Sequence, residues 1–192
     1  MSATMRSDDK YSGNAAAFLW VRSTEIMNSH ASDGDRRPMA EEYSRNAPAR
    51  IVIHEFGHAL AALTAAQSQD RAVIFLSAAG AVRSAGAGWW RELVAQARDV
   101  IPDQAAEWIL DCGDEPGLAL AALREGVGTI ALDADEPVWS RVAQIAAGYD
   151  ARIVRVDRTG ALDLAGANNP QRECELYLSN NPDGVANPGA LG

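Results

Sequence analysis

The sequence predicts an α/β protein built on an open parallel sheet of about five strands with flanking helices. Three observations support this prediction. Short apolar runs rich in β-branched residues recur between residues 50 and 160 without alternating apolar and polar positions, which is typical of strands that helices cover on both faces. Segments with apolar residues at helical spacing separate these runs. Proline at the first turn and glycine after the last turn mark the ends of several such segments.

The first two strand–helix units open the organised part of the chain. Residues 51–53 form a β-branched run, Ile-Val-Ile, and residues 57–67 follow with alanine and leucine at helical spacing. Residues 72–76 are the second apolar run, and a glycine-rich turn leads from them to a helix over residues 89–100, which ends before Pro102. The buried side of this helix is expected to carry Trp90, Leu93, Val94 and Ala97.

The next units repeat the pattern. Residues 108–110 and 129–132 are the third and fourth strands, because both are short apolar runs between turn residues. Helices over residues 116–124 and 137–147 follow them, each opened by a proline and followed by a glycine. Residues 152–156, Arg-Ile-Val-Arg-Val, are the fifth strand and complete the sheet.

The segments outside this pattern differ from it in composition. Residues 1–49 are rich in Ser, Asp, Arg, Asn and Glu, so we expect a disordered or loosely docked arm, in which residues 15–27 are the one candidate for a docking helix. Residues 161–192 are rich in Gly, Pro and Asn, and we expect a mostly disordered tail with a single helical turn at residues 173–178. The α/β domain is therefore predicted to span residues 50–160.

Charge and composition exclude several classes of partner. The chain has a formal net charge of −9 and a pI near 4.8, whereas nucleic acids and anionic membranes attract surfaces rich in Lys and Arg. Two widely spaced cysteines, Cys112 and Cys174, make neither a disulfide framework nor a zinc knuckle. No apolar run approaches the ~20 residues that span a bilayer, and the N-terminus has no secretory signal pattern. We therefore expect a soluble cytoplasmic protein that binds a small molecule and whose short edge strands permit a homodimer.

One segment, HEFGH at residues 54–58, resembles the HExxH signature of the zincin metallopeptidases. The resemblance covers about nine residues, including the apolar neighbours on both sides. It implies that His54 and His58 bind Zn²⁺ from one face of a helix. It also implies that Glu55 is the general base that acts on a metal-bound water.

Three features of the sequence argue against a zinc site in this segment. A third ligand has no familiar place, because the only other histidine is His30 in the arm and a carboxylate such as Glu92 belongs to no recognisable second motif. Strand-type residues run directly up to His54, and Gly57 separates it from His58, so His54 is expected at a strand end. Zincins are also not built from successive parallel strand–helix units. We therefore favour a chance match and keep the peptidase as an alternative.

The predicted fold surrounds His54 with other strand-end residues. In open α/β sheets, ligands bind outside the carboxyl ends of the strands. Glu55, Asp111 and Asp133 also follow strands, the two aspartates at equivalent places in the repeated sequences LDCGDEP and LDADEP. Several carboxylates with a histidine suit Mg²⁺ or Mn²⁺, and they equally provide an acid–base pair. The alternative is that such aspartates only cap the next helix. Capping is the role expected for Asp114 and Asp135, which follow Asp111 and Asp133 in their turns.

A glycine-rich segment after the second strand, residues 80–88, is a candidate anion cradle. Backbone N–H groups at the start of a helix bind anions, and Arg83, Ser84, Gly86 and Gly88 are the residues that would contact a cofactor there. The segment matches neither a P-loop nor a dinucleotide fingerprint. A plain connecting loop is therefore the alternative.

The middle of the chain, residues 77–127, is similar to a family of small bacterial proteins, mainly alphaproteobacterial, without an assigned function. The similarity lies in the segments AGAGWW, LDCGD and GLALAALREGV. It implies an α/β fold and no particular reaction. The rhythm of these units also resembles the strand–helix units of TIM barrels, so a partial barrel is the alternative to the open sheet.

Together these observations favour a small-ligand or divalent-metal site at the carboxyl ends of the strands, in an active or a degenerate enzyme. The alternatives are a zinc metallopeptidase and a non-catalytic interaction protein. The candidate residues are Glu55, Asp111 and Asp133 for catalysis, Arg83, Ser84, Gly86 and Gly88 for cofactor contacts, and His54 and His58 for a metal.

Overall fold

The computed structural model describes residues 48–181. Within this range, six parallel strands form one open sheet in the order β5-β4-β3-β2-β1-β6, which confirms the predicted α/β class. The strands are β1 (Ala49–Ile53), β2 (Val73–Ser77), β3 (Ala106–Asp111), β4 (Thr129–Ala131), β5 (Arg152–Val154) and β6 (Leu162–Asp163). The helices are α3 (Phe56–Ser68), α4 (Ala81–Ser84), α5 (Gly86–Val100), α6 (Pro116–Arg124), α7 (Glu136–Ala147) and α8 (Pro170–Asn180). None of these helices is long and apolar enough to cross a membrane.

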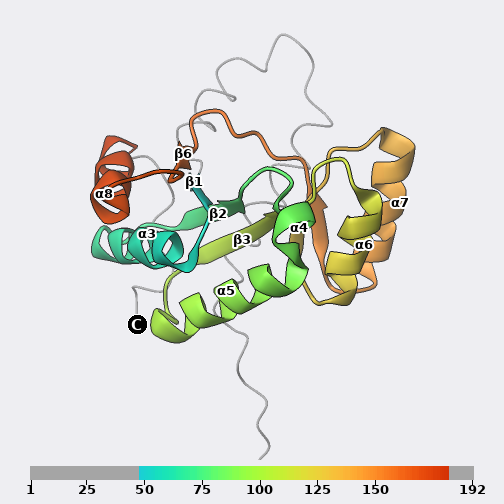
Figure 1. Ribbon diagram of the computed structural model, residues 1–192, viewed down its shortest axis with the longest axis horizontal. Helices are drawn as coiled ribbons and strands as arrows, with labels where there is room; N and C mark the ends of the chain where they lie inside the picture. Colours follow the sequence, from blue (N-terminus) through green and yellow to red (C-terminus); the bar gives the residue numbers. More distant parts are fainter. Residues whose placement is uncertain (1–47, 182–192) are drawn as a thin grey trace, which may run out of the picture.

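The described helices all pack on one face of the sheet (Figure 1), whereas the apolar strands predict helices on both faces. Trp90, Leu93 and Ala97 of α5 join one large apolar cluster with alternate strand residues such as Phe75 and Leu110. The reason is topological. From β1 to β5 each strand pairs with the strand before it, so the sheet grows steadily in one direction. Right-handed crossovers that all advance in one direction place their helices on the same face.

The opposite face of the sheet, called the back face below, carries a second apolar cluster. Its strand residues are Val52, Ile74, Leu76, Ile109, Ala131 and Val154. The connection from β5 to β6, residues 155–161, reverses direction and returns to the other side of β1, so the same handedness places it on the back face. Figure 1 shows this connection passing over the top of the drawing from β5 to β6.

The predicted disordered tail from residue 161 is wrong for residues 162–180, which form β6 and α8. β6 pairs with β1 through Ile51–Leu162 and Val52–Asp163. α8 packs against α3 (Figure 1) and buries Leu178 completely. β6 was not predicted, because a two-residue strand has no measurable period. Of α8, only the single turn at residues 173–178 was predicted, because Asn and Pro residues surround the helix.

A buried arginine fastens the end of α8. Nη2 of Arg71 donates to the carbonyl of Asn181 at 2.5 Å, and Nη1 donates to the carbonyl of Leu178 at 3.5 Å. A cation at a helix C-terminus satisfies carbonyls that lack partners within the helix. The organised unit therefore extends to residue 181 and not to 160. The predictions for residues 1–47, including the docking helix, and for residues 182–192 lie outside the described part of the chain.

Candidate functional site at the carboxyl edge of the sheet

The carboxyl edge of the sheet brings a histidine and an aspartate together at β1 and β6. His54 follows the last residue of β1, and Asp163 ends β6, 109 residues further along the chain. Nε2 of His54 lies 2.6 Å from Oδ1 of Asp163. The parallel register sets this contact, because Asp163 pairs with Val52 and its side chain lies on the same face as that of His54.

Other hydrogen bonds fix the orientation of Asp163. Its Oδ1 also accepts the backbone N–H of Ala165 at 2.9 Å. Burial acts to raise the pKa of Asp163, but the hydrogen bonds from Ala165 and His54 and the positive charge of Arg158 together lower it below its ordinary value. An ionised Asp163 therefore faces His54 at neutral pH and favours a proton on Nε2 of the imidazole.

The free nitrogen of this imidazole is the feature that matters for chemistry. The described residues make no hydrogen bond to Nδ1 of His54. The side chain of His54 is 30% exposed, so a solute can reach it. An imidazole with one nitrogen held by a carboxylate and the other free is suited to take up or release a proton.

The HEFGH segment spans a strand end and a helix start. α3 begins at Phe56, so His58 lies in its first turn, whereas His54 and Glu55 precede the helix. The backbone N–H of His54 donates to Nδ1 of His58 at 3.3 Å, and Nε2 of His58 lies 3.6 Å from Oε1 of Glu55. The two imidazole planes meet at 85° with their centroids 5.9 Å apart.

This arrangement does not fit the metal that the zincin signature implies. A zincin needs both histidines on one helix face at a spacing of four residues, and His54 lies outside α3. Nδ1 of His58 accepts a backbone N–H and Nε2 of His54 faces Asp163, so each imidazole keeps only its other nitrogen, and that of His58 lies against Glu55. Among residues 48–181, no group of three or more His, Cys, Asp or Glu side chains is placed to hold a metal ion. The divalent metal predicted at the strand ends therefore lacks a ligand set in this range.

Asp111, at the end of β3, ties several segments of the carboxyl edge together. Its Oδ1 accepts the backbone N–H groups of Gly80 at 2.9 Å and Gly113 at 2.8 Å. Its Oδ2 accepts a hydrogen bond from Nη2 of Arg158 at 2.6 Å, and the same nitrogen donates to the carbonyl of Ser77 at 2.9 Å. The side chain of Asp111 is only 14% exposed. These contacts show a structural tie between the loop after β2, the turn after β3 and the β5–β6 connection.

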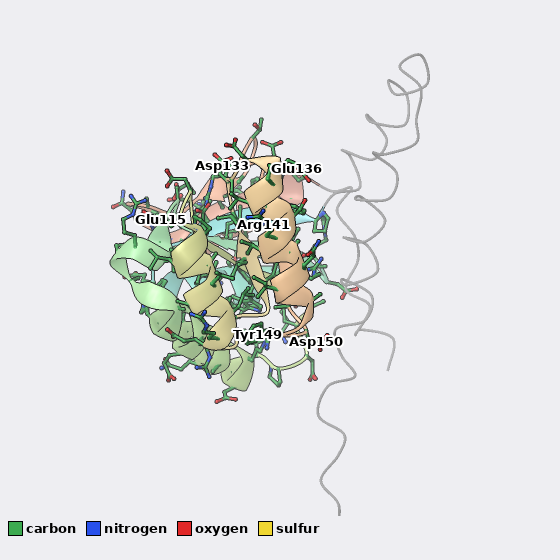
Figure 2. All side chains as sticks on the ribbon, turned by 90° about the vertical axis from the view of Figure 1, so that its right-hand side faces the viewer. Glu115, Asp133, Glu136, Arg141, Tyr149 and Asp150 are labelled. Atoms are coloured by element: carbon green, nitrogen blue, oxygen red, sulfur yellow. The ribbon has the colours of Figure 1, made fainter. Side chains whose placement is uncertain are left out.

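Asp133, the other predicted strand-end acid, projects into solvent. Its side chain is 94% exposed, and Oδ1 lies 3.9 Å from Nη1 of Arg155. Figure 2 shows Asp133 near Glu136, at the end of the molecule where α7 begins. No hydrogen bond or ion pair joins Asp133 to His54 or Asp111, so the three predicted residues do not form one cluster.

The predicted anion cradle is folded into two helices. Gly80 and Gly86 adopt positive φ values of 62° and 81°, and they precede α4 and begin α5, respectively. Gly88 lies in the first turn of α5, and Oγ of Ser84 bonds the carbonyl of Ala81 within α4 at 3.4 Å. The segment is therefore not an open loop that wraps a ligand.

Arg83 is directed at protein carboxylates. Its Nη2 lies 3.2 Å from Oδ1 of Asp114 and 2.7 Å from Oε1 of Glu115. All three side chains are substantially exposed, so this contact ties α4 to the start of α6 only weakly.

Cys112, next to Asp111, is not an available nucleophile. Its side chain is fully buried, and burial together with the charge of Asp111 raises its pKa to about 12. The thiolate is the reactive form of cysteine, and it is therefore scarce at this position near neutral pH.

No protein-family model matches this chain, and no curated protein matches it. The similarity of residues 77–127 to a small bacterial family therefore stays a prediction. The interpretation of the site rests on its own geometry.

Asp163 and the partner of Arg158 were not predicted from the sequence. Asp163 lies between Leu162 and Leu164 in a stretch too short for a strand pattern, and its partner His54 is 109 residues away. One weak signal is present, because Leu162 and Leu164 flank Asp163 in a segment that otherwise looks polar. An apolar–acid–apolar sequence after the last predicted strand is a hint of one more strand.

Proposed function

We propose that this protein binds a small molecule at the carboxyl edge between β1 and β6, and that His54 exchanges a proton with it. The observation that carries the proposal is the 2.6 Å contact between Nε2 of His54 and Oδ1 of Asp163. It joins the ends of two neighbouring parallel strands, which is where ligands bind in open α/β sheets. Asp163 is the positioning residue in this proposal, because it holds the imidazole and its proton.

The surroundings of His54 indicate the kind of ligand. α3 begins two residues later, no side chain caps its N-terminus, and its first turn carries no acidic residue. The first N–H groups of a helix lack partners within the helix and attract negative charge. A ligand with a hydroxyl group for His54 and a negative group for the start of α3 suits both features. Hydroxy acids and sugar phosphates combine these two groups.

Thermal unfolding in the presence of such compounds tests the proposal. A ligand present at about 100 times its Kd stabilises a protein by about 2.7 kcal/mol, which corresponds to a rise in Tm of about 5–10 °C for a chain of this size. The wild-type protein should show this rise with at least one hydroxy acid or sugar phosphate. His54→Ala should abolish the rise, and Asp163→Asn should reduce it.

Asp133→Asn is the matched control, because Asp133 is a strand-end acid that is 94% exposed and distant from His54 in the contact network. It should leave the rise in Tm unchanged. A compound that stabilises His54→Ala as strongly as the wild-type protein contradicts the proposal. So does a panel of both classes in which no compound raises the Tm of the wild-type protein.

Metal analysis separates this proposal from the zinc peptidase. Protein purified from zinc-supplemented medium should contain much less than one zinc per chain, because His54 and His58 face different partners. Stoichiometric zinc that disappears in both His54→Ala and His58→Ala would show instead that the HEFGH segment rearranges into a metal site.

A further inference from the structure

The back face of the sheet is buried although no described helix covers it. A parallel sheet is stable only when both faces are shielded from water. The exposed fractions of its apolar side chains are 3% for Val52, 9% for Ile74, 1% for Leu76, 6% for Ile109, 4% for Ala131 and 8% for Val154.

The β5–β6 connection supplies only part of this cover. Two of its side chains, Val156 and Ala161, pack on the cluster. Arg158 holds the connection at the carboxyl ends of the strands through the carbonyl of Ser77. Ile74 lies nearer the amino ends of the strands, in register with Glu107 of β3.

An ion pair on the same face also requires cover. Arg152 and Glu107 are joined across the back face, and their side chains are 16% and 9% exposed. Withdrawing two charges from water is costly, so such a pair is found where other groups of the protein displace the water. The region around this pair lies away from the β5–β6 connection, near the amino ends of the strands.

We propose that residues 15–27 of this chain pack on the back face as an amphipathic helix. Residues 1–47 precede the described range and lead directly into β1, whose Val52 belongs to the back face. Residues 15–21, AAAFLWV, are the strongest apolar run in that segment. A helix of this length is about 20 Å long, and strands are about 4.8 Å apart, so it crosses about four strands. Residues 28–47 reach about 66 Å when extended and do not limit the placement.

Helical spacing gives this segment an apolar side. At 100° per residue, five apolar side chains and Ser23 fall within one arc of about 120°. Arg22 and Glu25 fall outside it, together with Phe18 and Val21. The five are Ala16, Leu19, Trp20, Ile26 and Met27. By contrast, residues 182–192 carry no comparable run, so they are the weaker occupant.

Thiol labelling of the full-length chain tests the inference. Ala131→Cys places a thiol on the back face with little change in volume, at a position that is 4% exposed. This thiol should react slowly with a disulfide reagent in the native protein. Adding Leu19→Glu should accelerate its labelling by about tenfold or more, because local cover is lost. Adding Thr24→Glu, outside the apolar arc, should leave the rate unchanged.

The two natural cysteines distinguish local uncovering from unfolding. Cys112 and Cys174 are fully buried, and the pKa of each is raised to about 12 by burial and nearby acids, so they label only when the whole protein unfolds. Faster labelling of residue 131 with these two unchanged supports the inference. Equal rates with and without Leu19→Glu overturn it. A rate that falls as protein concentration rises also overturns it, because a second copy then covers the face.

A cross-link keeps the inference testable if Leu19→Glu unfolds the protein. The double variant Leu19→Cys, Ala131→Cys should form an intrachain cross-link with a short bismaleimide. The matched variant Ser2→Cys, Ala131→Cys should not. Equal yields in the two variants contradict the placement of residues 15–27 on the back face.

Discussion

Asp111 and Asp133 occupy the same place in two repeated sequences, yet their carboxylates have different surroundings. Asp111 is 14% exposed and accepts hydrogen bonds from Gly80, Gly113 and Arg158, whereas Asp133 is 94% exposed. The sequence placed both at strand ends but gave no sign of this difference. The difference in surroundings comes from Arg158, which lies in the β5–β6 connection, 47 residues after Asp111, and binds only Asp111 of the two.

Asp111→Ala should therefore destabilise the protein strongly. The substitution leaves two backbone N–H groups and a guanidinium without their acceptor, so the free energy of unfolding should fall by about 2–4 kcal/mol. Asp133→Ala should change it by less than about 0.5 kcal/mol. Urea denaturation of both variants measures the difference. Similar effects from the two substitutions would mean that Asp111 does not tie the edge together.

The pKa of Asp163 predicts how the pair with His54 responds to acid. Burial raises this pKa, but the bonds from Ala165 and His54 outweigh it, so the folded-state pKa lies below the ordinary value of 3.8. A lowered carboxyl pKa contributes stability above the unfolded pKa, and this contribution is lost as the pH falls through the folded pKa. The stability advantage of the wild-type protein over Asp163→Asn should therefore be present at neutral pH and shrink below about pH 4. Because Asp163 is 57% exposed, the advantage should be small.

Urea denaturation of both proteins at several pH values between neutral and about pH 3 measures this change. An advantage that stays constant over this range would show that Asp163 contributes by shape and not by charge.

At the scale of helices and strands, local sequence was enough wherever an apolar pattern between turn residues marks the element. The predicted helix over residues 116–124 has the observed bounds, and the predicted helix 57–67 differs from α3 by one residue at each end. The five longer strands were found for the same reason, because each is centred on a short apolar stretch. β6 was missed because two residues carry no periodic signal. Only the turn at residues 173–178 of α8 was predicted, because the surroundings of this helix resemble a disordered tail.

α8 offers a direct test of whether residues beyond 161 belong to the core. Leu178 is fully buried between α8 and the rest of the apolar cluster, whereas Leu176 is 53% exposed. Leu178→Ala should lower the free energy of unfolding by about 2–5 kcal/mol, and Leu176→Ala by less than about 0.5 kcal/mol. Thermal or urea unfolding distinguishes them. If Leu178→Ala has no more effect than Leu176→Ala, α8 is not part of the folded unit.

At the scale of the whole molecule, the sequence predicts the class of fold but not how its layers are arranged. Parallel strand–helix units indicate an open sheet, but the order of the strands decides which face the helices cover. In this sheet β1 to β5 are added in one direction, so their helices share one face, and β6 then returns to β1 and not to β5. The candidate site was half predicted for the same reason, since His54 was expected at a strand end but its partner lies on the missed strand.

Truncation tests the limits of the folded unit. A chain ending at residue 160, the predicted boundary, lacks β6 and α8 and with them Leu164, Cys174 and Leu178, all fully buried. It should not unfold cooperatively. A chain ending at residue 181 should keep the Tm of the full-length protein within about 2 °C. Circular dichroism during heating measures both. Cooperative unfolding of the shorter chain at an unchanged Tm would restore the boundary at residue 160.

The return of β6 to β1 has a consequence during synthesis on the ribosome. Strands β1 to β5 emerge in the order in which they pair, so each one can join the edge left by the strand before it. The other edge, at β1, stays unpaired until β6 has been synthesised, and β6 ends at Asp163, 110 residues after Ile53. At about 5–20 residues per second, that edge stays unpaired for about 5–20 s in every nascent chain. An open strand edge can pair with a neighbouring chain, so this interval is when the protein is most exposed to misassembly on crowded polysomes.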